Sequence, residues 1–180
     1  MTERSQVLFI GGRSGVGKTT VAAAVFERLS HAGVRHCVIE GDNLDMAHPT
    51  PWEAGQPIAE LNLAAVWRDY SAFGYRRLIY TNTSAVRPEA MLSMTDAMGD
   101  DPEVFGVLLQ ATDEAAEGRL GRRESRDSLR VHVERSRRAA QRLDAVAPDS
   151  VMRINTTDRT PAAVAAEIVD LLGWAPSSRD

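Results

Sequence analysis

The chain has 180 residues, of which 43% are apolar, and a formal net charge of −4 at pH 7. This length suits one α/β domain with a sizeable core, and the apolar content argues against disorder. No stretch approaches the roughly 20 apolar residues that a membrane-spanning helix needs, and the first residues contain no apolar run of signal-peptide length. We therefore expect a cytoplasmic protein with a single domain over residues 1–174 and a disordered tail at 175–180.

The charges are distributed unevenly along the chain. Between Glu117 and Arg142 there are nine arginines and four acidic residues, a local net charge of +5, so the remainder carries −9. An overall basic surface of the kind that binds nucleic acid is therefore not expected, and we predict neither a nucleic-acid nor a membrane partner. The single cysteine, Cys37, excludes an intrachain disulfide and a cysteine-built zinc site. Its apolar surroundings predict a buried, unreactive thiol.

Short apolar runs alternate with helical patterns. An apolar run at 7–10 is followed by a glycine-rich turn and a helical pattern from Gly17 to about Ala32. A second run at 36–39 precedes a proline-rich loop at 48–57 and a helix at about 58–73. The pattern continues with a strand at 77–80, a helix at about 88–98, a strand at 104–109, helices between about 113 and 143, a strand at 151–154 and a last helix between Pro161 and Gly173. Five strands that alternate with helices indicate βαβ crossovers and a parallel sheet.

The turn after the first strand matches G-x-x-x-x-G-K-[ST] at every fixed position, reading Gly12-Arg13-Ser14-Gly15-Val16-Gly17-Lys18-Thr19. The backbone N–H groups of such a loop, together with the N-terminus of the following helix, bind phosphate. We predict that this loop and Thr20 bind ATP, with Lys18 reaching the β- and γ-phosphates, Thr19 offering its hydroxyl to Mg²⁺ and Thr20 reaching the α-phosphate. Lys18 is the only lysine beside 20 arginines, so chance explains its position poorly.

The composition also narrows the class of nucleotide-binding protein. A GTPase would need the lysine of N-K-x-D to recognise guanine, and the chain has no second lysine. Large ATPase modules need a longer chain. A small ATP-dependent kinase is therefore the default interpretation, and a regulatory ATPase without a small-molecule acceptor is the alternative. A polynucleotide-end kinase would need a basic groove, against which the acidic remainder of the chain argues.

The second predicted strand ends in Glu40-Gly41-Asp42-Asn43. Because ligands of parallel sheets bind beyond the carboxyl ends of the strands, this segment is expected near the γ-phosphate. We predict that Asp42 is a catalytic residue that orients and deprotonates an acceptor hydroxyl, or that it holds a water on Mg²⁺. The alternative to this interpretation, which we favour less, is that Asp42 makes an Asx-turn or caps a helix. Asp45 is its main rival for contact with the substrate, and Asn62 is a further substrate-contact candidate.

The third predicted strand does not end in the aspartate of a Walker-B motif. It runs instead through Leu78-Ile79-Tyr80 into Thr81-Asn82-Thr83. A Mg²⁺ ion would then be held by Thr19, phosphates and water, with Asp42 as the best nearby carboxylate.

The arginine-rich segment at about 113–143 is predicted to form a helical lid. Guanidinium groups suit the charge that spreads over phosphoryl oxygens during transfer, and we select Arg119 and Arg123 as catalytic residues. The alternative is an ordinary solvated helix surface. Residues at helical spacing would pack this segment onto the body: Leu129, Val133, Ser136, Ala140 and Leu143.

The turn after the fifth predicted strand, at 155–160, is polar. In a fold of this kind it lies where an arginine can meet the adenine, so Arg159 is predicted to bind the nucleotide. An ordinary loop with a helix cap at Thr160 would explain the same residues.

With these motifs in place, the chain resembles the small P-loop kinases of the adenylylsulfate kinase, shikimate kinase and chloramphenicol phosphotransferase type. The likeness lies in Gly12 to Thr20 and in Glu40-Gly41-Asp42-Asn43, which is similar to the G-D-N turn of adenylylsulfate kinases. The resemblance implies a three-layer α/β/α P-loop fold, a five-stranded parallel sheet in the order 2-3-1-4-5 and a helical lid after the fourth strand. It also implies contact between Asp42 and the acceptor. Leu44-Asp45-Met46 stands where those enzymes have an arginine-bearing stretch, so we do not predict adenylylsulfate as the substrate.

These features together predict an ATP-dependent phosphotransferase that uses ATP and Mg²⁺. Its partners would be a nucleoside triphosphate and a small molecule whose hydroxyl group accepts the γ-phosphate.

Overall fold

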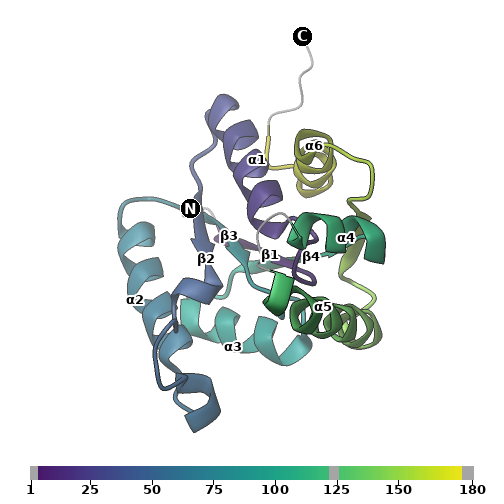
Figure 1. The fold of residues 1–180 in the computed structure, drawn as a ribbon. Coiled ribbons are helices and arrows are strands. Elements are labelled where there is room, and N and C mark those ends of the chain that lie inside the picture. Colours follow the sequence, from purple (N-terminus) through teal and green to yellow (C-terminus); the bar gives the residue numbers. More distant parts are fainter. Residues whose placement is uncertain (1–3, 122–125, 176–180) are drawn as a thin grey trace.

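The computed structural model describes residues 4–121 and 126–175 (Figure 1). Within these residues lies a sheet of five parallel strands in the order β2-β3-β1-β4-β5, which confirms the predicted topology. Each strand begins and ends within two residues of its predicted bounds. The strands are β1 (Gln6–Gly11), β2 (Cys37–Glu40), β3 (Arg77–Thr81), β4 (Glu103–Gln110) and β5 (Met152–Asn155).

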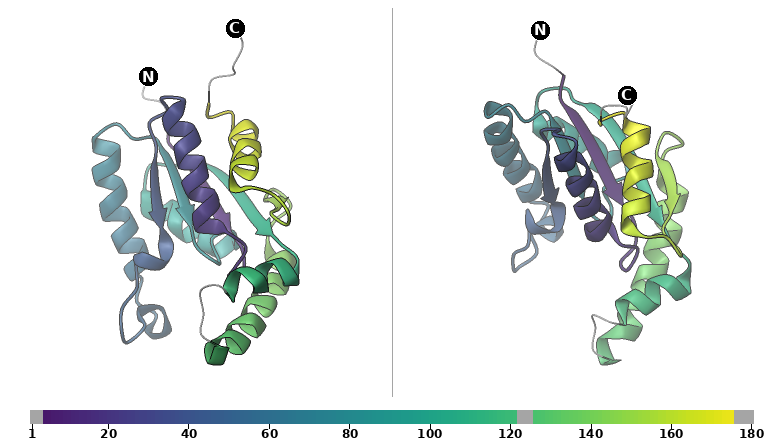
Figure 2. Two further views of the ribbon diagram at one scale, coloured as in Figure 1. Left: turned by 45° about the horizontal axis from the view of Figure 1, so that its top comes forward. Right: turned by 90° about the horizontal axis from the view of Figure 1, so that it is seen from above.

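Helices cover both faces of the sheet, which gives the three-layer α/β/α fold (Figure 2). On one face, α1 (Lys18–His31) and α6 (Pro161–Leu172) pack side by side. The other face carries α2 (Ile58–Ala72), α3 (Pro88–Met98) and α5 (Arg126–Val146), and α4 (Asp113–Leu120) packs against α5. In the described ranges, no helix is both long enough and apolar enough to span a bilayer.

The central strand β1 is buried on both faces. Leu8 and Ile10 pack in the cluster beneath α1 and α6, whereas Val7 and Phe9 belong to the cluster beneath α2, α3 and α5. All four side chains are fully buried. A strand that is apolar at every position suits a parallel sheet covered on both sides. This burial determines where the carboxyl end of β1, and the loop that follows it, leave the sheet.

The predicted helical lid corresponds to α4 and α5. Along α5, Ser136 and Leu143 are buried and Ala140 is half-buried, as the predicted packing seam requires. Arg123, one of the two arginines predicted to be catalytic, lies outside the described residues.

The C-terminal end of the described chain is packed rather than loose. Trp174 is buried in the core, and Ala175, the first residue of the predicted tail, packs against the same cluster. The rest of that tail, residues 176–180, lies outside the described residues.

Cys37 begins β2 and is buried, as predicted. The loss of hydration raises the pKa of its thiol to about 12. The thiolate is therefore scarce at neutral pH, which makes Cys37 an unreactive structural residue.

Candidate active site

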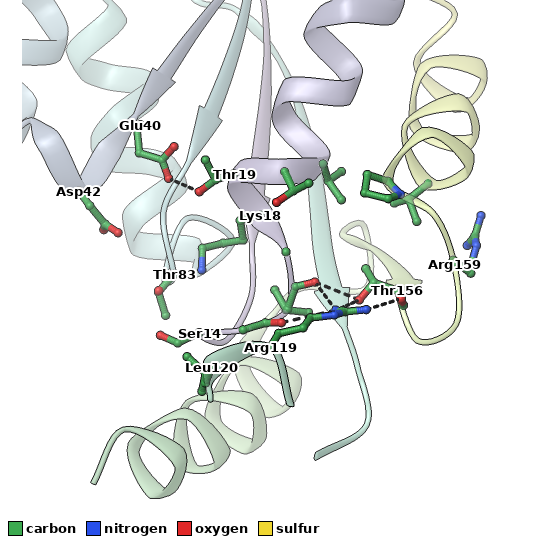
Figure 3. Close-up of a pocket in the computed structure, with 17 residues that line it drawn as sticks. Ser14, Lys18, Thr19, Glu40, Asp42, Thr83, Arg119, Leu120, Thr156 and Arg159 are labelled. Carbon is green, nitrogen blue, oxygen red and sulfur yellow. Dashed lines mark hydrogen bonds between the residues drawn. The ribbon is translucent and has the colours of Figure 1, made fainter. Parts of the chain in front are cut away.

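The predicted phosphate-binding loop follows β1 and borders an open cavity of about 570 Å³ (Figure 3). α1 begins with Lys18 directly after the loop, so the positive end of its dipole lies at the cavity. Gly15 has a φ of 82°, and a Cβ there would lie 2.5 Å from the carbonyl oxygen of Ala116, so only glycine lets the loop pass so close to α4. The polar and loop residues that line the cavity are Ser14, Gly15, Val16, Gly17, Lys18, Thr19, Thr20, Glu40, Asp42, Thr83, Arg119, Thr156 and Arg159.

Lys18 projects into this cavity from the first turn of α1 (Figure 3). Its Nζ donates a hydrogen bond to the carbonyl oxygen of Gly12 at 2.9 Å and a longer one to that of Arg13 at 3.4 Å. The ammonium group is therefore held across the loop, where a compact positive charge can meet a bound phosphate.

The carboxylate of Glu40, at the end of β2, lies beside Thr19 (Figure 3). The Thr19 hydroxyl donates to Glu40 Oε1 at 2.9 Å. A hydroxyl whose proton is directed to a carboxylate keeps its lone pairs available, which suits a ligand of Mg²⁺. From the sequence we expected Asp42 to be the best carboxylate near a Mg²⁺ ion held by Thr19. The carboxylate in contact with Thr19 belongs instead to Glu40. The described residues contain no group of three or more His, Cys, Asp or Glu side chains that could hold a metal, so a Mg²⁺ ion here would also need phosphate and water ligands.

Asp42 lies in the 3₁₀ turn Gly41–Asn43 that follows β2, and it lines the same cavity. Its Oδ1 accepts a hydrogen bond from Asn82 Nδ2 at 2.6 Å. Asn82 is itself held in place, because its backbone N–H donates to the carbonyl oxygen of Ile10 and its Oδ1 accepts from the backbone N–H of Ser84. The segment after β3 lacks a Walker-B aspartate. It supplies instead the side-chain amide of Asn82, which orients the Asp42 carboxylate after the neighbouring strand β2.

The surroundings of Asp42 raise the pKa of its carboxyl group. The largest cause is reduced hydration; the Lys18 ammonium opposes it, and the negative charges of Glu40 and Asp45 raise the pKa further. A carboxylate with a raised pKa is a better proton acceptor than an ordinary surface aspartate, which is the property required of a general base.

A second cavity, of about 350 Å³, adjoins Asp42. It is lined by Gly41 and Asn82, which are the chain neighbour and the hydrogen-bond partner of Asp42. Asp42 itself lines the first cavity, and the residues next to it line the second. Asp45, the predicted rival of Asp42, lines the second cavity together with Glu60.

Asn62 lies outside both cavities, contrary to the expectation that it contacts a substrate. Its Nδ2 donates to the carbonyl oxygen of Leu44 at 2.6 Å, which fastens α2 to the turn after β2. Residues two apart on a helix point in directions that differ by roughly 200°. Glu60, on the same helix, faces the second cavity in its place.

Two of the predicted arginines line the cavity beside the predicted phosphate-binding loop. Arg119 Nη1 donates to the carbonyl oxygen of Val16 and to Thr156 Oγ1, both at 3.0 Å, and its Nη2 donates to the carbonyl oxygen of Thr156 at 2.9 Å (Figure 3). Arg119 therefore connects α4, the phosphate-binding loop and the end of β5, and its catalytic role stays a prediction. Arg159 also lines the cavity, where its guanidinium pairs with Glu167 at 2.6 Å.

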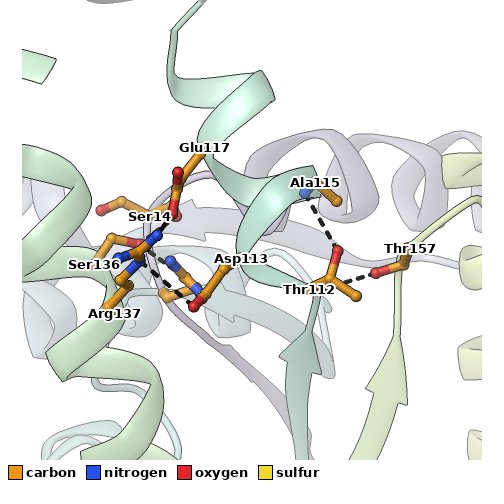
Figure 4. Close-up of polar contacts among 9 residues, drawn as sticks. Ser14, Thr112, Asp113, Ala115, Glu117, Ser136, Arg137 and Thr157 are labelled. Carbon is orange, nitrogen blue, oxygen red and sulfur yellow. Dashed lines mark hydrogen bonds and ion pairs between the residues drawn. The ribbon is translucent and has the colours of Figure 1, made fainter.

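Arg13 belongs to the loop but does not line the cavity. Its side chain is only 3% exposed; Nε donates to Ser136 Oγ at 2.8 Å and Nη1 pairs with Asp113. Ser136 Oγ in turn donates to the carbonyl oxygen of Ser14 at 2.9 Å (Figure 4). The hydrogen bond from Arg13 is the main reason that the pKa of Asp113 is lowered. The Arg13 side chain therefore ties the loop to α4 and α5, and the predicted contact of Arg13 with the nucleotide could come only from its backbone.

Sequence reasoning missed three contributors to the site: Glu40 as the partner of Thr19, Glu60 in the second cavity and Ser136 as the partner of Arg13. The place of Glu40 could have been inferred, since it ends a strand at the same edge as the phosphate-binding loop. Glu60 carried no local signal. The helical spacing that predicted a packed position for Ser136 could not reveal its contact with Arg13, because tertiary packing creates that contact.

Comparison with protein families gives one partial match. Residues 4–48 match the family model described as adenylylsulphate kinase, a segment that runs from β1 through the phosphate-binding loop to the turn that contains Asp42. No curated protein sequence matches the chain.

Solved structures share the fold over nearly the whole chain. APS kinase CysC of Mycobacterium tuberculosis, in complex with AMPPNP and APS, is 20% identical with a TM-score of 0.59, over 94% of this chain and 98% of that one. The tunicamycin resistance protein of Deinococcus radiodurans is 22% identical with a TM-score of 0.65, over 94% and 96%. Shikimate kinase of Acinetobacter baumannii, in complex with shikimate, is 18% identical with a TM-score of 0.58, over 93% of each chain.

The link between the loop and α5 can be tested by Ser136→Ala. We expect the free energy of unfolding to fall by about 1–3 kcal/mol, because the buried Arg13 Nε loses its acceptor and the carbonyl oxygen of Ser14 loses its donor. Urea denaturation measures the change. Ser30→Ala, at an exposed position of α1, is the matched control and should change stability by less than about 0.5 kcal/mol. Equal stability of the two variants would show that the link is dispensable.

Proposed function

We propose that this chain, which has the fold of the small P-loop kinases, transfers the γ-phosphate of ATP to a hydroxyl group of a small molecule. The observation that carries the proposal is the position of Asp42. Its carboxylate, oriented by Asn82, lines the cavity of the phosphate-binding loop, and its neighbours Gly41 and Asn82 line a second cavity of small-molecule size. Two adjoining cavities with a candidate base beside them are what a transfer between two bound reactants requires.

In the proposed reaction, the acceptor oxygen attacks the γ-phosphorus of ATP. A bond forms between these atoms while the bond between the γ-phosphorus and the β–γ bridging oxygen breaks, and ADP leaves. Asp42 Oδ2 or Oδ1 takes the proton of the attacking hydroxyl, and Asn82 holds the carboxylate in position for it. Lys18 and the N-terminus of α1 stabilise the negative charge on the phosphates.

The residues around Thr19 suit a Mg²⁺ ion. Thr19 would be its protein ligand, and Glu40 would orient the Thr19 hydroxyl through the hydrogen bond already present. When bound, the ion would neutralise part of the phosphate charge.

Adenylylsulfate is not the acceptor that we propose. It is an anion, and the described residues that line the second cavity include two carboxylates, Asp45 and Glu60, and no lysine, arginine or histidine. Like charges brought together in a partly buried site repel each other strongly.

Nucleotide binding tests the first half of the proposal. Lys18→Ala should weaken ATP binding by at least about tenfold, because the chain then lacks the only ammonium at the phosphates. Isothermal titration calorimetry with a non-hydrolysable ATP analogue measures the affinity. Arg68→Ala, which removes an exposed cation on α2, should leave it unchanged. Normal affinity in the Lys18→Ala protein would contradict a nucleotide site at this loop.

Transfer itself can be tested by a screen of hydroxyl compounds for ADP release above the buffer-only rate. With an acceptor in hand, Asp42→Asn should lower kcat by about 10²- to 10⁴-fold, the usual contribution of a general base, and leave ATP affinity nearly intact. Full activity of this variant would move the base to Asp45 or elsewhere. A screen in which no compound raises turnover would favour the regulatory ATPase.

The dependence of kcat on pH provides a separate test. A base works only when deprotonated, so activity should fall as the pH drops through the raised pKa of Asp42. Asp45→Asn removes one of the negative charges that raise this pKa and should move the acidic limb of the profile to lower pH. Asp69→Asn, at an exposed position of α2, should leave the limb in place. A limb that stays put in Asp45→Asn would exclude Asp42 as the titrating group.

A further inference from the structure

The second cavity has an unusual charge for a site beside a triphosphate. Among the described residues that line it, two are acidic and none is a lysine, arginine or histidine. Asp45 and Glu60 are both partly buried. A cation is the partner that best compensates two neighbouring, partly buried carboxylates, so this cavity favours a positively charged ligand.

Neither carboxylate is neutralised within the described part of the chain. Asp45 forms no hydrogen bond or ion pair there. Glu60 Oε1 accepts a hydrogen bond from Ser93 Oγ at 2.8 Å, but this donor is neutral. The hydrogen bond positions Glu60 and leaves its charge in place.

Tyr80, on β3, gives an independent indication of a ligand. Its side chain is 3% exposed and lines the cavity, and its hydroxyl oxygen lies so close to Gly41 that a Cβ there would be 2.3 Å away. The hydroxyl makes no hydrogen bond within residues 4–121 and 126–175. Burial, together with the charges of Asp42, Asp45 and Glu60, raises its pKa, so it stays a neutral phenol. The residue is buried, yet it lines the cavity, so a ligand there could hydrogen-bond to the phenol.

Trp52 contributes an aromatic wall. It lies in the 3₁₀ turn Pro51–Ala54, lines the cavity and is 64% exposed. An aromatic ring beside carboxylates is a combination that binds organic cations, since its face attracts positive charge.

We propose that the acceptor is a hydroxyl compound that carries a protonated amine, with the ammonium group bound between Asp45 and Glu60 and the reacting hydroxyl directed toward Asp42. The identification rests on the proposed function, because it assigns the second cavity to the acceptor. A neutral polyol would leave both carboxylates uncompensated, and an anion would be repelled. The volume of about 350 Å³ admits a molecule of the size of an amino sugar.

The proposal is tested by binding, without turnover. The protein, loaded with a non-hydrolysable ATP analogue, is titrated by ligand-observed NMR with sets of compounds that share one skeleton: glucosamine, glucose and glucuronate, and 4-aminocyclohexanol, cyclohexanol and 4-hydroxycyclohexanecarboxylate. We expect the amine of each set to bind at least about tenfold more tightly than its neutral or acidic counterpart. Equal binding within each set, preference for the carboxylates, or no binding of either amine would overturn the proposal.

Variants locate the bound amine. Asp45→Asn and Glu60→Gln keep the shape of each side chain, and Gln can still accept the Ser93 hydrogen bond. Each should weaken amine binding by about tenfold and leave the binding of neutral compounds unchanged. Asp96→Asn, an exposed acidic residue of α3 outside the cavity, is the control and should have no effect. Amine binding that is insensitive to both cavity variants would place the amine elsewhere and refute the proposal.

The two proposals fail in different ways. Amines that bind selectively but are never phosphorylated would uphold the cation site and count against the kinase. Phosphorylation confined to neutral or acidic compounds, detected by ³¹P NMR of the product, would uphold the kinase and refute the cation site.

Discussion

All five strands of the described sheet run in the same direction, and the site depends on this constraint. Parallel strands bring their carboxyl ends to one edge of the sheet. The phosphate-binding loop after β1, the acidic turn after β2 and Asn82 after β3 therefore meet there, although they are far apart in the sequence. β1 can hold the centre because its side chains are apolar on both faces. The polar chemistry therefore begins where the buried strands end.

Negative charge is the main electrostatic problem at this edge. Glu40, Asp42, Asp45 and Glu60 lie around a site that is proposed to bind a triphosphate, and Lys18 is the only lysine. The raised pKa of Asp42 is one result of this crowding. A metal ion at Thr19 and a cation in the second cavity would each compensate a different part of the excess. The repulsion among these carboxylates thus favours the binding of a positively charged group at each of the two places.

The fold could be predicted almost completely from the sequence, because apolar runs, helix caps and the glycine-rich loop are local signals. The phosphate-binding loop and Asp42 could be placed because they follow strands directly. Asn62 lies outside both cavities, which its position in the sequence could not reveal, because spacing along α2 does not show which side of the helix faces a cavity. The contacts of Glu60 and Ser136 and the direction of the Arg13 side chain depend on packing between distant segments. No local pattern in the sequence predicts such contacts.

The hydrogen bond between Arg13 and Ser136 joins positions 123 residues apart. Position 13 is one of the unconstrained places of the phosphate-loop motif, and position 136 lies on a helix that the motif does not include. The two positions nevertheless depend on each other, since a change at one leaves a buried polar group at the other without this partner. Among relatives, the two positions should therefore change together. We expect arginine at position 13 where position 136 on α5 carries a hydroxyl group, and an apolar or small residue at position 13 where it does not. A variable position of the motif would then be set by the helix against which the loop packs.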